Sequence, residues 1–228
     1  MGLFLSMSGI IGVSADVARD ALGAYAKHTS ILFEPAGTVT EGPDIGAITR
    51  EGQNTTILYP PEFMEWDEAS QFLSDRLAAP VFSLHIHDGD LWMYILFNHG
   101  EEVDWFNPVP EYWQANLPEE EKSKWKGDPE LVAHLVPSLD PDVIRRYYVE
   151  WDLEQEEEVK AYSDDRFPLC DCWQVCDFMR RLGLQYPIED NETLSGDSFR
   201  LGRKAPRTSG GASTTDKKPR KEPWWRFW

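Results

Sequence analysis

The dipeptide Asp88-Gly89 is the sequence feature that most constrains the fold, because it separates two stretches of largely apolar residues. Asp-Gly in this position is typical of a two-residue β-hairpin turn, whose central residues both need positive φ angles. The sequence therefore predicts a hairpin over residues 81–97. A two-residue turn also fixes the cross-strand partners, because side chains alternate between the two faces. It places Ser83 opposite Tyr94, His85 opposite Trp92, and His87 opposite Asp90.

The two faces of this hairpin differ in character. In the predicted register, one face is entirely apolar and should belong to the core: Phe82, Leu84, Ile86, Leu91, Met93, Ile95 and Phe97. The opposite face mixes rings with polar groups, and we expect His85, Trp92 and Tyr94 to form a binding surface there, since such side chains dominate binding energy when a partner covers them. A helix of the same domain is the alternative cover for this face.

Periodicity and turn residues predict the rest of an α+β fold, with a mixed, largely antiparallel sheet, the central hairpin (81–97), and helices packed on one sheet face. A third strand should follow the hairpin after a three-residue loop, His99-Gly100-Glu101. The remaining strands are expected at 3–13, 30–34, 46–50 and 54–59, and the helices at 14–28, 61–77, 119–125, 129–135, 141–149 and 171–182. At 228 residues, the chain supplies one sizeable core.

Composition divides the chain into three parts. Residues 1–188 should form an acidic globular domain. Residues 189–223 are rich in Ser, Thr, Gly, Lys and Pro, which is typical of a flexible linker. Residues 224–228 are almost wholly aromatic and predict a docking peptide.

Charge is the most unusual bulk property. The chain carries a formal charge of −18; residues 197–228 contribute +6, which leaves −24 on residues 1–196. Clusters at Glu119–Glu121, Glu154 and Glu156–Glu158 contribute to it. Such a field repels nucleic acid and attracts basic proteins. We therefore expect a basic protein partner and no nucleic acid.

The segment KKPRKEPWWRFW, residues 217–228, combines basic and aromatic residues. Its last five residues, Trp224, Trp225, Arg226, Phe227 and Trp228, need an apolar surface to cover them. A groove on this domain, a groove on a partner, and a membrane interface are three possible destinations. We favour the hypothesis that these residues dock as a tethered peptide over the hypothesis that they contact a membrane.

A catalytic or metal site is the competing interpretation. His87 opposite Asp90, with His85 beside it, resembles a general base held by a carboxylate, which would suit a small hydrolase or transferase. His85 and His87 could also join Cys170 and Cys172 in a zinc site, although Cys172 and Cys176 fit equally well as buried helix residues. No nucleotide-binding or hydrolase motif occurs, and no cofactor is expected.

The sequence thus favours a non-enzymatic, protein-binding module, acidic like immunity and inhibitor proteins that neutralise basic toxins. Three cysteines within seven residues make a poor disulfide framework, and no export signal is recognised, so a cytoplasmic location is expected. The oligomeric state is left open.

Overall fold

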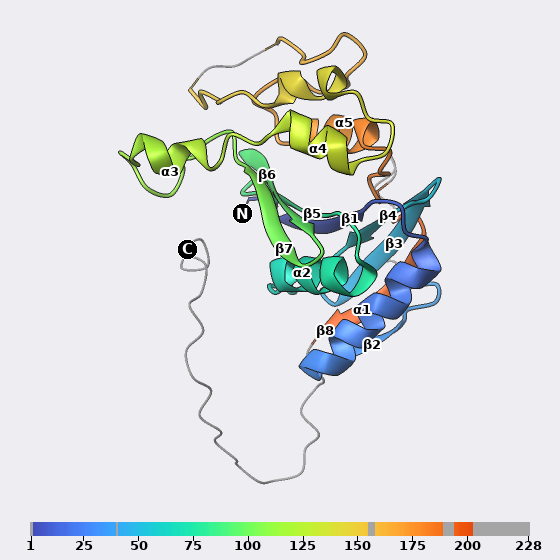
Figure 1. Cartoon of the computed structure of the whole chain (residues 1–228). Helices are drawn as coiled ribbons and strands as arrows, with labels where there is room; N and C mark the ends of the chain where they lie inside the picture. The colour runs from blue at the N-terminus through green and yellow to red at the C-terminus, as the bar shows by residue number, and fades with distance from the viewer. Residues whose placement is uncertain (1, 40, 155–157, 189–193, 203–228) are drawn as a thin grey trace.

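The protein has an α+β fold built on one eight-stranded sheet, as the sequence predicts (Figure 1). The computed structural model describes residues 2–39, 41–154, 158–188 and 194–202. All strand pairings in the sheet are antiparallel, in the order β2-β8-β3-β4-β1-β5-β6-β7. The strands are β1 (Leu5–Ile10), β2 (Leu32–Pro35), β3 (Ile45–Glu51), β4 (Asn54–Leu58), β5 (Val81–His87), β6 (Leu91–Asn98), β7 (Glu101–Phe106) and β8 (Asp197–Gly202).

Helices α1 (Ala15–Thr29) and α2 (Trp66–Leu77) cover one face of the sheet (Figure 1). Helix α1 matches the predicted range 14–28: Ser14 is its N-cap residue, without a side-chain capping hydrogen bond, and Ala21, Leu22 and Tyr25 are buried. Val17 is 51% exposed. Helix α2 begins at Trp66 rather than Pro61. This later start leaves one end of the sheet face without a helix over it.

The opposite face is also covered, so helices pack on both faces of the sheet, as the alternative of a covering helix predicts. Residues of α4 (Pro129–Leu135) and α5 (Gln174–Arg181) pack against β5 and β6 in the larger of two core clusters (Figure 1). The predicted helix at 141–149 is two short 3₁₀ turns, Pro141–Val143 and Arg145–Tyr147. Helix α3 (Glu119–Ser123) has no buried residue and projects from the body.

The end of α5 follows the sequence closely. Gly183 adopts a φ of +68°, and the Leu184 amide donates to the Met179 carbonyl at 2.9 Å. This is the bond that closes a Schellman motif, and Leu184 is buried in the same core cluster as Met179.

The predicted hairpin exists, but its register is shifted by one residue. His85 lies opposite Met93 rather than Trp92, and His87 opposite Leu91. Asp88 and Gly89 both have positive φ, and the Asp90 amide donates to the His87 carbonyl at 3.0 Å, so the expected turn forms. Asp90 then stays outside the ladder as an extra residue, and the loop spans three residues. A single inserted residue moves every side chain of β6 to the other face.

This shift places Trp92 and Tyr94 in the core with Phe82, Leu84 and Ile86, so these two rings do not share an exposed face with His85 as predicted. Both rings are 0% exposed and contact Phe178 of α5, at centroid distances of 4.9 and 5.6 Å. Aromatic contacts at such distances add to the energy of area burial.

The third strand also departs from its predicted connection. β7 follows a two-residue turn, His99-Gly100, and its register shifts beside Leu96 and Phe97. Asp104 is consequently buried, and its carboxylate accepts the Tyr94 hydroxyl at 2.6 Å.

Strand β8 corrects the predicted domain boundary. It lies inside the range 189–223 that composition assigns to a linker, yet it pairs with both β2 and β3. Phe199 and Leu201 are buried and alternate with more exposed neighbours, which is the pattern of a strand. The Ser, Arg and Gly between and around them make the segment resemble a linker in composition. Residues 189–193 and 203–228, with the predicted docking peptide 224–228, lie outside the described residues. Each helix in the described part of the chain is too short or too polar to cross a bilayer.

Replacing Phe199 tests whether β8 is an integral strand. Phe199→Ala should lower the free energy of unfolding by about 3 to 5 kcal/mol, because the ring is 2% exposed and its loss leaves a cavity. Ser198→Ala on the same strand should change it by less than about 0.5 kcal/mol. Urea denaturation of both variants measures this, and equal stabilities would place β8 outside the cooperative fold.

Candidate functional site

A cavity of about 610 Å³ opens on the sheet face that carries α1 and α2. It lies beyond the N-terminus of α2, where β1, β5 and β6 are not covered by a helix. Its size falls within the roughly 300–1,000 Å³ typical of ligand sites. Apolar and aromatic side chains form most of its wall: Phe4, Leu5, Tyr59, Phe63, Met64, Trp66, Met93, Ile95, Trp113 and Trp125. Ser6, Asp67, Ser83, His85 and His87 are its polar groups.

His85 is held in the cavity wall by contacts on several sides. Its Nδ1 lies 3.0 Å from the Ser6 hydroxyl on β1, and its Nε2 lies 3.4 Å from Nδ1 of His87. The Trp66 ring stacks on the imidazole with its plane only 7° away. Burial, together with the neighbouring His87, lowers the pKa of His85 to about 3. His85 is therefore neutral near pH 7.

His87 sits at the more open end of the cavity. Phe4 and Trp113 both meet its ring edge to face at centroid distances of 5.0 Å. Burial lowers the pKa of His87 too, against the opposing charges of Asp88 and Asp90. An imidazole enclosed by rings in this way offers an aromatic contact surface as much as a base.

Asp67, in the first turn of α2, provides a carboxylate on the cavity wall. It accepts a hydrogen bond from the Ser83 hydroxyl on β5 at 2.6 Å. The bond ties the N-terminus of α2 to the sheet beside the cavity. The cavity can therefore present apolar area together with an oriented polar group, which is the usual composition of a specific binding site.

The pairing of His87 with Asp90 predicted for catalysis does not form as expected, because the two residues are not opposite one another. The Asp90 carboxylate instead accepts the Tyr112 hydroxyl at 2.5 Å. The structure does bring His85 and His87 together, as their spacing on one strand predicts.

The predicted zinc set is divided by the sheet. His85 and His87 face the cavity, whereas Cys172 is buried in the core cluster of the other face and Cys170 packs against it. Burial raises the pKa of the Cys172 and Cys176 thiols to about 12, which opposes the thiolate form that binds metal. Within the described ranges, no group of three or more His, Cys, Asp and Glu side chains could hold a metal ion.

Among the described residues predicted to bind, His85 lies on the cavity side of the sheet and stacks on Trp66, Tyr94 lines the cavity although its ring is buried, and Trp92 does not line it. The residues Trp224, Trp225, Arg226, Phe227 and Trp228 lie outside the described residues. Sequence reasoning did not place Phe4, Met64 and Trp66 at a site. The exposed fractions of Phe4 (47%) and Met64 (57%) are the feature that identifies them, and exposure is a property of the fold.

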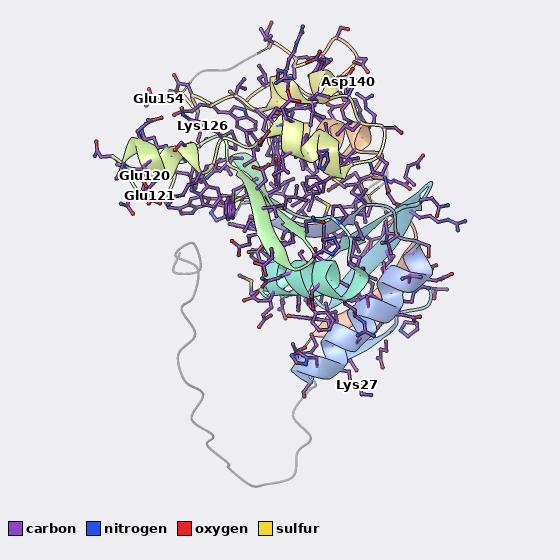
Figure 2. The ribbon with its side chains drawn as sticks, in the orientation of Figure 1. Lys27, Glu120, Glu121, Lys126, Asp140 and Glu154 are labelled. Atoms are coloured by element: carbon purple, nitrogen blue, oxygen red, sulfur yellow. The ribbon has the colours of Figure 1, made fainter. Side chains whose placement is uncertain are left out.

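The cavity lies in the most acidic part of the chain. Residues 51–121 hold fifteen acidic residues against one basic residue, Arg76, a formal charge of −14. These residues include α2, β5, β6 and β7. Figure 2 shows Glu120 and Glu121 at the outer edge of the molecule, on the projecting α3. A positively charged ligand would be attracted to this side at low ionic strength.

The chain was compared with known proteins, and no protein-family profile, curated protein or solved structure matches it. The candidate site therefore depends on its own geometry and charge.

The buried His85 should make the protein less stable as pH falls. Its pKa is about 3 in the folded state and about 6.5 when unfolded, so the unfolded chain binds a proton first. Its contribution to stability is complete above pH 6.5 and is lost progressively toward pH 3. Between pH 7 and 5, the loss should be about 2 kcal/mol.

Urea denaturation of the protein and of His85→Gln at both pH values measures this loss. The free energy of unfolding should fall by about 2 kcal/mol more in the unsubstituted protein than in the variant. Parallel pH dependence in the two proteins would contradict a buried, neutral imidazole.

Proposed function

We propose that this protein is a non-enzymatic, cytoplasmic binding module of the immunity or inhibitor type, which captures a basic polypeptide. The observation that carries the proposal is an apolar cavity set in a span of residues with a formal charge of −14. Charge would speed the encounter with a basic partner, and the cavity would take an apolar side chain as the anchor.

The excess of acidic over basic residues in residues 1–202 supports this proposal. Residues 1–202 carry 38 acidic and 14 basic residues. Several of these cations are already held by acidic neighbours, as Lys122 is by Glu111 and Arg200 is by Asp44. Three acidic residues of the 51–121 span, Glu111, Glu119 and Glu121, are paired with Lys122, Lys126 and Lys124, and residues 51–126 still carry a net formal charge of −11.

Exposed apolar side chains at the rim of the cavity favour binding of an apolar side chain from the partner. Phe4 and Met64 expose large apolar side chains beside it, and a partner covering them would gain the free energy of their burial. Methionine and aromatic side chains also make favourable sulfur and ring contacts with an aromatic anchor. The anchor that fits best is an aromatic side chain flanked by lysine or arginine.

A labelled peptide of sequence KRKGWGKRK tests this proposal in fluorescence anisotropy. It should bind the protein, bind more weakly as NaCl rises from 50 to 300 mM, and lose about tenfold or more in affinity when its tryptophan is replaced by serine. Glu62→Gln/Glu65→Gln beside the cavity should weaken binding by about 3- to 10-fold.

The matched control is Asp20→Asn/Glu34→Gln, which removes two exposed charges from α1 and β2 and should alter affinity less than about twofold. Binding insensitive to salt, or equally weakened by both pairs of substitutions, would contradict capture at the cavity.

The contact between Ser6 and His85 favours a second candidate function, a small hydrolase or transferase. In it, Ser6 would be the nucleophile and His85 the base, at 3.0 Å. In this assignment Asp90 has no catalytic role, in contrast to the prediction, because its carboxylate accepts a hydrogen bond from Tyr112.

A fluorophosphonate probe tests this second candidate. It should label Ser6 covalently, which mass spectrometry would detect and which Ser6→Ala should abolish. Because the pKa of His85 is about 3, the base is neutral throughout, and the labelling rate should be constant from about pH 5 to 9. An unlabelled Ser6 would exclude this function.

A further inference from the structure

We infer that the cavity is the docking site of this chain's own residues 217–228, so that the protein occupies its own binding site until a basic partner displaces the segment. The inference rests on the proposed function, because it assumes that the cavity accepts a basic, aromatic polypeptide. It adds the identity of the resident ligand, KKPRKEPWWRFW.

Charge complementarity is the first argument. Residues 217–228 contain five lysines and arginines and one glutamate, a formal charge of +4. Residues 51–121, which supply most of the cavity wall, carry −14. Opposite fields of this size hold the segment near the cavity and resist its escape at low salt.

Chemical fit is the second argument. The segment offers four large rings in five residues, Trp224, Trp225, Phe227 and Trp228. The cavity offers rings and thioethers in return, among them Trp66, Trp113, Met64 and Met93. Its volume of about 610 Å³ suits a cluster of aromatic side chains better than a single aliphatic one. A segment this aromatic needs an apolar cover, and the cavity is apolar.

The length of the connecting chain is the third argument. Strand β8 ends at Gly202, and three strands, β3, β4 and β1, separate it from β5 in the sheet. Four steps of about 4.8 Å place β5 roughly 19 Å away. A linker of 21 residues, the length of 203–223, has a root-mean-square reach of about 25 Å, which is enough to span this distance.

Tethering makes the intramolecular complex the dominant one. A flexible connection of this length gives an effective concentration of about 1 mM. Even if the detached segment bound with a Kd of only about 100 µM, the tethered segment would fill the cavity about 90% of the time. A second copy at micromolar concentration would compete poorly for the same site.

Oxidation of Met64 tests the inference in the full-length protein. Met64 lines the cavity, and its side chain is 57% exposed within the described part of the chain, so a docked segment should shield it. The variant W224A/W225A/F227A/W228A should lose this shield. Hydrogen peroxide should then oxidise Met64 about tenfold faster than in the unsubstituted protein, as measured by mass spectrometry of the Met64 peptide.

Two controls accompany this measurement. S213A/T214A/T215A changes the connecting segment without changing its aromatic residues and should leave the oxidation rate unaltered. Met7 and Met179, each 0% exposed, should stay protected in all forms and thereby report that the fold is intact. Equal Met64 oxidation in the aromatic variant and the unsubstituted protein would overturn the inference.

Two further measurements separate the outcomes. Protection of Met64 should be independent of protein concentration; protection that appears only on raising the concentration would show docking between copies and overturn the intramolecular assignment. The peptide KRKGWGKRK should bind the aromatic variant about tenfold more tightly than the unsubstituted protein. Equal binding to both would overturn the inference alone, whereas binding to neither would overturn the proposed function.

Discussion

The three-residue turn between β5 and β6 is the constraint on which the rest of the structure depends. Asp88 and Gly89 form the turn, and Asp90 is added after it, so His87 lies opposite Leu91. Side chains alternate along a strand, and this one residue decides which face each residue of β6 joins. It sends Trp92 and Tyr94 into the core and leaves Met93 and Ile95 in the cavity wall.

The layer on the core side is held by buried carboxylates as well as by rings. Asp165 accepts the Tyr147 hydroxyl at 2.8 Å and pairs with Arg181 at 2.9 Å. Asp177 of α5 accepts the backbone amides of Arg166 and Phe167. These bonds tie the irregular segment before α5 to α5 itself and to the turn at Tyr147, because a buried carboxylate without partners would be costly. The face carrying α1 and α2 has no comparable cover beyond the start of α2, and the cavity lies there.

Charge and shape point to the same kind of ligand on this uncovered surface. Asp67 of α2 lines the cavity, and Asp88 and Asp90 of the β5–β6 turn act on His87 in the cavity wall, so field and apolar area act on one molecule at once. The chain itself contains a segment of the complementary type, basic and aromatic, within reach of the site. A resident segment of this kind would make partner binding a competition and would keep the exposed Phe4 and Met64 from non-specific association.

The sequence by itself determined the α+β class, the hairpin and the approximate ranges of α1, α2, α4 and α5, because these follow from local periodicity and turn chemistry. Local signals also placed His85 and His87 side by side. Only the tertiary structure decided the register, since Asp88-Gly89 permits a turn with or without an added residue, and packing of Trp92 and Tyr94 on Phe178 selects one. It also decided that β8 joins the sheet, because pairing with β2 and β3 compensates for a weak strand sequence. The cavity arises from residues of β1, α2, β5 and the 107–125 region, and no local pattern brings those together.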